Sequence, residues 1–262
     1  MAIQKPIQKP EQVANPKPSI NPLNWKIVNA EVVSNHNIVK RKVIVYKTLV
    51  DPTIIKLAAE KTKDRVFRRY GFLRPPADQI RQVSFEKDYE PYFVVEGKYT
   101  IDYYRGRTYT IPIDANALEI VLLDQTLKPE PTKEWHQNKT IKIQGEERLI
   151  HEDKAYLVLD TNGREVSAKR LPSAPQEEHP KKILAEYESA RKLDFDPNRE
   201  VEVLRSKIAK RPREIGRIVN ELFEVSDRAV IYIPIYTIRF KNTKTGEQKT
   251  VRFNGVTAQL VH

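Results

Sequence analysis

Two short stretches of the sequence share an unusual pattern, in which a tyrosine and a proline flank one residue at the start of an apolar run. They read YEPYFVV at Tyr89–Val95 and YIPIYTI at Tyr232–Ile238. Proline cannot donate a hydrogen bond to a sheet ladder, so it occurs at the start, the edge or a bulge of a strand. Two such strands in one chain predict two related units, each containing an equivalent strand.

The surroundings of these strands also match in order. Asp-Pro pairs at 51–52 and 196–197 each precede a basic segment that we expect to be helical, because Asp is a good N-cap and Pro fits the first turn. An Arg-Pro pair follows in each half, at 74–75 and 211–212, before the Tyr-x-Pro strand, a turn and a closing strand. The alternative is a chance similarity between strand-rich sequences.

We therefore expect an α+β fold of two related helix-plus-antiparallel-sheet units, with a small β-meander between them and an extended N-terminal tail. The expected tail is 1–24, rich in proline and lysine, and the N-terminal α+β unit is 25–125. The meander with its linkers is 126–175, and the C-terminal α+β unit is 176–262. A tail of this composition cannot bury a core, so we expect it to lie extended along a large partner.

Local patterns predict further elements. Alternation around SNHN predicts a β-hairpin of Trp25–Val33 and Ile38–Val45. The first helix should bury a stripe of apolar residues, and a second short helix should span Ile183–Lys192. The stripe contains Ile54, Leu57, Ala58, Val66 and Tyr70.

Three turns are predicted from their composition. We expect YRGRT, which begins at Tyr104, to be the tip of a hairpin, and NTKTGEQK, at 242–249, to be its equivalent in the second half. DTNGR, at 160–164, is typical of a hairpin turn within a meander whose strands lie between Lys139 and Ala168.

The net charge of the chain favours a polyanionic partner. Lys and Arg number 46 against 35 Asp and Glu, which gives a net charge of +11 and a pI near 9.5. Such an excess attracts nucleic acid, although a soluble basic protein without such a partner is the alternative.

The candidate phosphate-binding residues lie on the two expected helices and at the expected hairpin tips. Lysine and arginine bind phosphates without reading sequence, and the planar guanidinium can bond a phosphate in two places. Tyrosines beside arginine in YYRGR could also stack on unpaired RNA bases, whereas a solvated helix face and an ordinary strand are the structural alternatives. The candidates are Lys61, Lys63, Arg65, Arg68, Arg69, Arg105, Arg107, Arg205, Lys207, Lys210, Arg211, Arg213, Lys241 and Lys244.

No catalytic motif is found. The chain has no cysteine, and its five histidines lack metal-ligand spacing, so we expect no metal and no cofactor. The cluster HED at 151–153 has no nucleophile beside it, and no phosphate-binding glycine loop is present. We therefore predict that the protein is not an enzyme.

The sequence contains no apolar run long enough to span a bilayer and no signal-peptide pattern, so we expect no membrane partner and a cytoplasmic location. The absence of cysteine and the abundance of Lys, Arg and Glu lean toward a thermophile, an inference that the many Asn and Gln weaken.

One block, RRYGFLRPPADQIRQVSFEKDYEPYFVVEGKYTIDYYRGRTYTIPID, resembles an uncharacterised family of basic archaeal proteins, and the resemblance is best over 50–125. It supplies no catalytic residues. A basic protein of several units with an extended tail is also similar in build to ribosome-associated factors of the hibernation or subunit-dimerising kind. The resemblance therefore implies RNA, in particular ribosomal RNA, and ribosomal proteins as partners.

Three functions remain open at this point. The first is a non-enzymatic RNA-binding protein of the ribosome, which docks its basic helices and hairpin tips on phosphates. The second is a protein-interaction or self-association module, for example a homodimer, built on repeated edge strands. The third is non-specific binding of double-stranded DNA.

Overall fold

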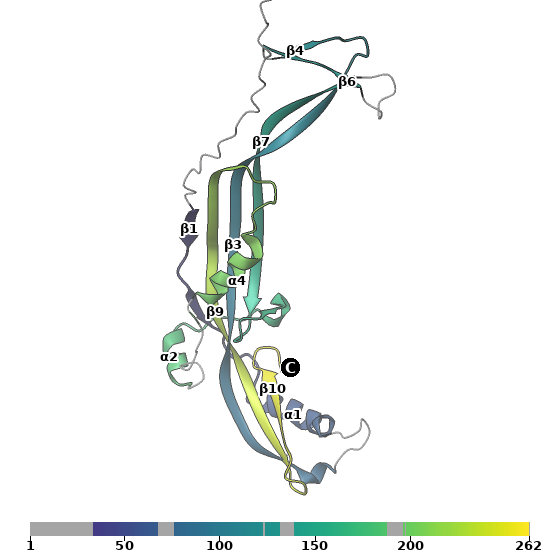
Figure 1. Ribbon diagram of the computed structural model, residues 1–262. Helices are drawn as coiled ribbons and strands as arrows, with labels where there is room; N and C mark the ends of the chain where they lie inside the picture. Colours follow the sequence, from purple (N-terminus) through teal and green to yellow (C-terminus); the bar gives the residue numbers. More distant parts are fainter. Residues whose placement is uncertain are drawn as a thin grey trace, which may run out of the picture.

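The computed structural model describes residues 34–67, 76–122, 124–131, 139–187, 196 and 198–261. The fold is mixed α+β, and most of its strands form one nine-stranded, mainly antiparallel sheet. The sheet is long and narrow, and its strands run along the length of an elongated molecule (Figure 1).

Three long strands form the centre of the sheet. β3 (Ile80–Ile113) lies between β7 (Lys139–Leu159) and β9 (Arg217–Asn242), and it pairs antiparallel with both. β3 alone has 34 residues, which at about 3.3 Å per residue corresponds to a length of roughly 110 Å. Such a length explains why the molecule is a rod rather than a globule.

Shorter strands complete the two sides of the sheet. On the β9 side they are β1 (Ser34–Ile38), β2 (Lys42–Val45), β10 (Gln248–Asn254) and, beyond β10, β11 (Leu260–Val261). On the β7 side they are β6 (Glu130–Pro131) and β8 (Glu165–Val166), while β4 (Ile120–Leu122) and β5 (Gln125–Leu127) form a separate pair.

The helices are short and few in the described part of the chain. They are α1 (Pro52–Val66), α2 (Pro180–Ala185), α4 (Arg199–Ile208) and the 3₁₀ turns η1 (Ala77–Gln79) and η2 (Ala168–Arg170). The predicted start of α1 is confirmed, because the Asp51 side chain accepts a hydrogen bond from Thr53 N at 2.7 Å and Pro52 occupies the first turn.

Both long helices pack on the same face of the sheet, at different ends (Figure 1). Near one end, Ile55 and Ala59 of α1 join Tyr236, Ile238 and Phe240 of β9 in one core. Farther along, α4 contributes to a second core, whose members include Val201, Leu204, Ile208, Phe93 and Tyr99. Because strand side chains alternate, the opposite face of the sheet carries a third core, which includes Tyr92, Val94, Ile231 and Ile233.

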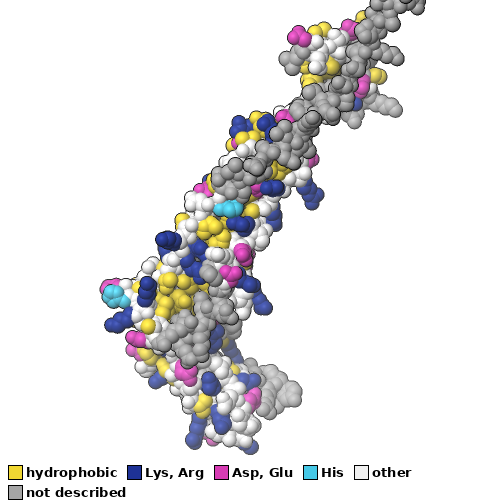
Figure 2. Space-filling model, turned by 60° about the vertical axis from the view of Figure 1, so that its left-hand side comes forward, with side chains coloured by type: hydrophobic (Ala, Val, Ile, Leu, Met, Phe, Trp, Pro, Cys, Tyr) yellow, Lys and Arg dark blue, Asp and Glu magenta, His cyan; other side chains and the backbone are white. Residues whose placement is uncertain are grey.

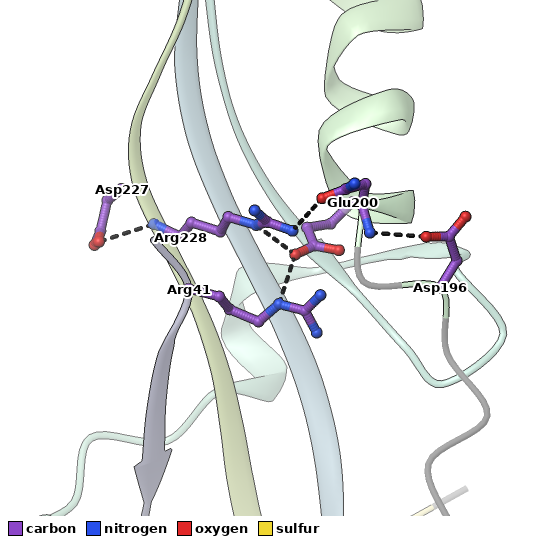
Figure 3. A network of polar contacts seen from close by, with 6 residues as sticks. Arg41, Asp196, Glu200, Asp227 and Arg228 are labelled. Carbon is purple, nitrogen blue, oxygen red and sulfur yellow. Dashed lines mark hydrogen bonds and ion pairs between the residues drawn. The ribbon is translucent and has the colours of Figure 1, made fainter. Parts of the chain in front are cut away.

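A buried ion network fixes the start of α4 to the sheet. Glu200 is fully buried. Its carboxylate accepts a hydrogen bond from Arg228 Nε at 2.8 Å and forms an ion pair with Arg41 Nε at 3.0 Å. Figure 3 shows the two arginines converging on this carboxylate from β9 and from the segment before β2. Arg228 Nη2 also donates to Asn198 Oδ1 at 3.1 Å, so the network ties together three segments that are distant in sequence.

The two Tyr-x-Pro stretches do not belong to two separate sheets, as the sequence had led us to expect. They lie in β3 and β9, which are adjacent strands of the same sheet. The expected meander is also absent as a separate element, because 139–159 forms the single strand β7, which pairs along β3. Alternating patterns specify that a segment is a strand, but they do not specify its neighbour, and this explains both errors.

The predicted hairpin around SNHN is wrong in its described part. Residues 34–38 form β1, and β1 and β2 each pair in parallel with β9 rather than with one another. The other predicted strand, Trp25–Val33, lies outside the described residues, as does the tail 1–24.

The predicted turn at YRGRT is also wrong, because β3 continues through it. Tyr103 lies opposite Leu149 and Arg105 lies opposite Glu147 in an uninterrupted ladder with β7. The other two turns are confirmed. Gly163 and Gly246 both have φ of 74°, the left-handed conformation that their hairpins require.

The predicted helix positions are partly wrong. Ala58 and Val66 of the predicted stripe pack against the core, but Ile54 and Leu57 are 53% and 58% exposed. Ile55 and Ala59 are buried instead, and Tyr70 lies outside the described residues. The described helix α2, Pro180–Ala185, overlaps the start of the predicted Ile183–Lys192, and 188–192 lies outside the described residues. Charged residues occur all around the first helix. Their positions therefore do not show which of two neighbouring apolar stripes faces the sheet.

Candidate nucleic-acid interface

The face of the sheet opposite α1 and α4 is called the helix-free face. At the end of the sheet where α1 packs on the other face, and beyond the third core, this helix-free face is exposed and basic. In β9 the even-numbered residues Tyr236, Ile238 and Phe240 point toward α1, so Arg239 and Lys241 point the opposite way. Both are exposed, as is Arg81 of β3.

The strand register brings these cations together. Arg81 lies directly opposite Lys241, and Arg239 lies between Ser84 of β3 and Thr250 of β10. Side chains that lie directly opposite in an antiparallel pair have Cβ atoms roughly 5 Å apart, and like charges in that position repel. Among the described residues, Arg81, Arg239 and Lys241 have no acidic partner within ion-pair distance.

A hairpin turn adds a fourth cation at the same end. The side-chain oxygen of Asn242 accepts hydrogen bonds from Lys244 N at 2.9 Å and Thr245 N at 3.1 Å. This contact fixes the turn between β9 and β10 and leaves Lys244 exposed at its tip. We call the four residues Arg81, Arg239, Lys241 and Lys244 the basic face.

A pocket of about 370 Å³ lies beside the basic face on the same side of the sheet. Tyr92, Ile233 and Ile235 belong to its lining, together with Lys169 and Arg170 from η2. The pocket is next to the basic face by register, because its residue Val261 is opposite Arg252, and Arg252 is opposite Thr237. It therefore combines aromatic and aliphatic side chains with polar and cationic ones.

The phenol of Tyr92 stays neutral at physiological pH. Burial raises its pKa above the ordinary value, and the negative charge of Glu90 raises it further. Glu90 is itself paired with Arg252 at 3.1 Å. Tyr92 therefore contributes an uncharged ring to the pocket, and the positive charges come from Lys169 and Arg170.

The predicted basic residues of α1 lie elsewhere. Lys61 and Arg65 are exposed, but α1 packs on the opposite side of the sheet from the basic face. Lys63 pairs with Glu60 at 2.6 Å, whereas Arg68 and Arg69 lie outside the described residues.

The predicted residues of α4 and of the segment that follows it are largely occupied by contacts within the protein. Lys207 pairs with Glu165 at 2.7 Å, and Arg205 lies over the ring of Phe223 at 4.9 Å. Arg211 makes two hydrogen bonds with Glu221, at 3.0 and 2.5 Å. Lys210 and Arg213 are exposed.

Glu221 is held as a carboxylate by this arrangement. Arg211 lowers the pKa of Glu221 below its ordinary range, and a hydrogen bond from Tyr99 Oη, at 2.7 Å, lowers it further. Tyr99, Glu221 and Arg211 therefore form a chain of polar contacts from the core to the surface. The guanidinium of Arg211 is bonded to Glu221 in the free protein.

Arg105 and Arg107 are not at a hairpin tip, because both lie within β3. Arg105 pairs with Glu147 at 2.8 Å and Glu214 at 3.7 Å, whereas Arg107 is exposed. Gly216 N donates to Tyr104 O at 2.8 Å, which brings Arg107 into the neighbourhood of the segment after α4. Here basic and acidic side chains are paired, whereas on the side of the basic face the described residue Glu86, opposite Thr237, forms no ion pair with the four cations.

Of the predicted candidates, only Lys241 and Lys244 belong to the basic face. Sequence reasoning missed Arg81 and Arg239 as partners of these lysines. Arg239 and Lys241 are two positions apart in a strand, which is a signal that they share a face, but nothing in the sequence indicates that Arg81 lies opposite Lys241. In Figure 2, lysine and arginine side chains are distributed along the length of the molecule and mixed with acidic ones.

The described residues contain no group of three or more acidic, histidine or cysteine side chains arranged to hold a metal ion. In the HED cluster, His151 Nε2 lies 3.0 Å from Asp153 Oδ2, and both residues are part of β7. The helices in the described ranges are all too short or too polar to cross a membrane.

No family model, curated protein or solved structure matches this chain. The resemblance to archaeal ribosome-associated proteins therefore stays a prediction.

Proposed function

We propose that the protein is a non-enzymatic RNA-binding protein that holds the phosphates of RNA on the basic face. The observation that carries this proposal is the cross-strand pair of Arg81 and Lys241, with Arg239 beside it, on an open sheet face. Repulsion within this group costs stability in the free protein, and a bound polyanion relieves it.

The chemistry of the surrounding side chains fits a sugar–phosphate backbone. Ser84, Thr237 and Thr250 lie on the same face as the cations, and hydroxyl groups donate readily to phosphate oxygens. Arginine adds a planar fork that can bond one phosphate in two places. These contacts position RNA without reading its sequence.

The pocket beside the basic face favours single-stranded over duplex RNA. An unpaired nucleotide can leave the strand and place its base against aromatic and aliphatic side chains, whereas a base in a duplex is not available. Tyr92 and Ile235 would contact the base, and Arg170 would remain close to the backbone. Ribosomal RNA, together with ribosomal proteins, is the partner that the archaeal resemblance favours, and binding there would make the protein cytoplasmic.

Binding of fluorescein-labelled single-stranded RNA, measured by anisotropy, tests the proposal. We expect the variant R81Q/R239Q/K241Q/K244Q to bind at least tenfold more weakly than the wild type. The matched control K61Q/R65Q/K210Q/R213Q removes the same charge from the region of the two helices, and we expect it to bind nearly normally.

Three results would contradict this function. Equal losses in the two variants would mean that net charge alone attracts the RNA, and no loss in either would exclude both surfaces. Competition by duplex DNA as strong as by single-stranded RNA would replace the proposal with non-specific DNA binding.

A further inference from the structure

The outer edge of β7 is long and has little pairing. Among the described residues, β6 pairs only with 139–140 and β8 only with 158–159, so no strand pairs with the outer edge of 141–157. An edge of this length presents a row of backbone donors and acceptors to a further strand.

The side chains along this edge alternate in charge on the helix-free face. Even-numbered residues of β7 share a face with even-numbered residues of β3, since Ile150 lies opposite Asp102 and Arg148 opposite Tyr104. Ile150 is 72% exposed in the middle of this row. The charged residues on either side of it are Glu146, Arg148, Glu152 and Lys154. Within the chain, Arg148 also bonds Asp102 at 2.6 Å, and Lys154 pairs with Glu152 at 2.8 Å, so a second copy adds to these contacts.

We propose that the β7 edge binds the β7 edge of a second copy of this chain, antiparallel, with a two-fold axis through Ile150. An axis perpendicular to the sheet keeps each face on its own side, so residues pair with residues of the same parity. Arg148 then lies opposite the partner's Glu152, and Glu146 lies opposite the partner's Lys154. The symmetry repeats both pairs, and Ile150 meets its own counterpart.

Neighbouring registers lack this complementarity. An axis at position 148 or 152 places Arg148 or Glu152 against itself. An axis at 149 opposes Glu146 to Glu152, and an axis at 151 opposes Arg148 to Lys154. Like charges directly opposite are unfavourable, so the row of charges selects the register centred on Ile150.

The other face of the edge contains one unfavourable pair in this register, Glu147 opposite the partner's Asp153. Each of these carboxylates already has a partner in its own chain. Glu147 accepts hydrogen bonds from Arg105 Nε at 2.8 Å and Tyr109 Oη at 2.7 Å, and Asp153 lies 3.0 Å from His151 Nε2. These contacts reduce the repulsion on that face.

This dimer goes beyond the proposed RNA binding and does not depend on it, because none of the residues of the basic face lies on β7. Charged side chains on an edge strand can instead keep it from pairing, in which case the protein is a monomer. The two cases differ in a measurable way.

Cysteine cross-linking tests the register, since the wild-type chain contains no cysteine. We expect I150C to form a disulfide-linked dimer under mild oxidation, because residues that meet on the axis are within disulfide reach. Q144C alone and Y156C alone should not cross-link, since each lies far from its own counterpart. An equimolar mixture of Q144C and Y156C should cross-link, because position 144 faces position 156 in this register.

Charge reversal tests the proposed pairs in solution. By size-exclusion chromatography with light scattering, we expect the wild type to be a dimer and E146K to shift to monomer. The double variant E146K/K154E restores opposite charges and should restore the dimer. A wild type that stays monomeric at high micromolar concentration, or cross-linking of Q144C alone in place of I150C, would overturn the proposal.

Discussion

Tyr89 lies directly opposite Pro234 in the antiparallel pairing of β3 with β9, and Pro91 lies directly opposite Tyr232. The two Tyr-x-Pro stretches therefore lie side by side in opposite directions, symmetrically about the facing pair of Glu90 and Ile233. The arrangement explains how two prolines fit into central strands, which normally exclude them.

Each proline lies where its strand has no second neighbour. On the outer side of β9, pairing with β2 ends at Tyr232 and pairing with β10 begins at Ile235, so Pro234 lies in the gap. Its carbonyl oxygen points into that gap and accepts a hydrogen bond from Gly255 N at 2.7 Å. Likewise, β7 pairs with β3 only from Phe93 onward, beyond Pro91. The missing N–H of each proline therefore removes no ladder hydrogen bond.

The first prediction concerns two glycines of β3. A Cβ atom at Gly97 would lie 2.3 Å from Glu224 O and 2.8 Å from Leu204 Cδ2, whereas one at Gly106 would meet nothing within 4 Å. We expect G97A to lower the free energy of unfolding by about 2 kcal/mol or more, and G106A to change it by less than about 0.5 kcal/mol. Urea unfolding measures both. A large loss of unfolding free energy in G106A would indicate that YRGRT forms a turn rather than part of β3.

The second prediction concerns the buried carboxylate of α4. Removing the charge of Glu200 leaves the buried guanidinium of Arg228 without its ion pair, which typically costs about 3 kcal/mol or more. We expect E200Q to unfold at a clearly lower urea concentration than the wild type. E202Q changes an exposed residue of the same helix and should leave the midpoint nearly unchanged. Equal midpoints for E200Q and the wild type would show that the network does not anchor α4.

The third prediction is a pH dependence. Because Arg211 and Tyr99 lower the pKa of Glu221 in the folded state, its carboxylate stabilises the fold above the pKa of the unfolded chain, roughly 4. That contribution is lost as the pH falls through the lower pKa of the folded state. We expect the stability advantage of the wild type over E221Q, present at pH 7, to shrink as the pH falls below about 4.

Thermal unfolding at several pH values measures this advantage. E178Q, which changes an exposed glutamate, serves as the control and should give a nearly constant difference from the wild type. If the stability of the wild type relative to E221Q stays constant or increases as the pH falls, Arg211 does not stabilise the Glu221 carboxylate in the folded state.

Short-range features of the fold could be predicted from the sequence. The Asp51 cap and the turns at Gly163 and Gly246 follow from local backbone chemistry, and the structure confirms them. The strands were recognised as strands, yet their lengths and neighbours were not, since β3 passes through Gly106 where the composition indicates a turn. Pairing between residues more than a hundred positions apart has no local signal.

The candidate site shows the same limit. Lys241 and Lys244 could be chosen from charge and turn composition alone, whereas Arg81 becomes significant only through the register that places it opposite Lys241. Conversely, Arg211 and Lys207 resemble phosphate ligands in sequence, but glutamates from other segments occupy them. That the two halves of the chain are related units stays a prediction.

The salt dependence of RNA binding tests the central claim most directly. Each phosphate contact to a single strand contributes about 0.7 to the slope of log affinity against log salt concentration, so the loss of four contacts should reduce the slope by roughly 3. We predict this reduction for R81Q/R239Q/K241Q/K244Q and a nearly unchanged slope for K61Q/R65Q/K210Q/R213Q. A wild-type slope retained by the first variant would contradict the assignment of the basic face as the RNA-binding surface.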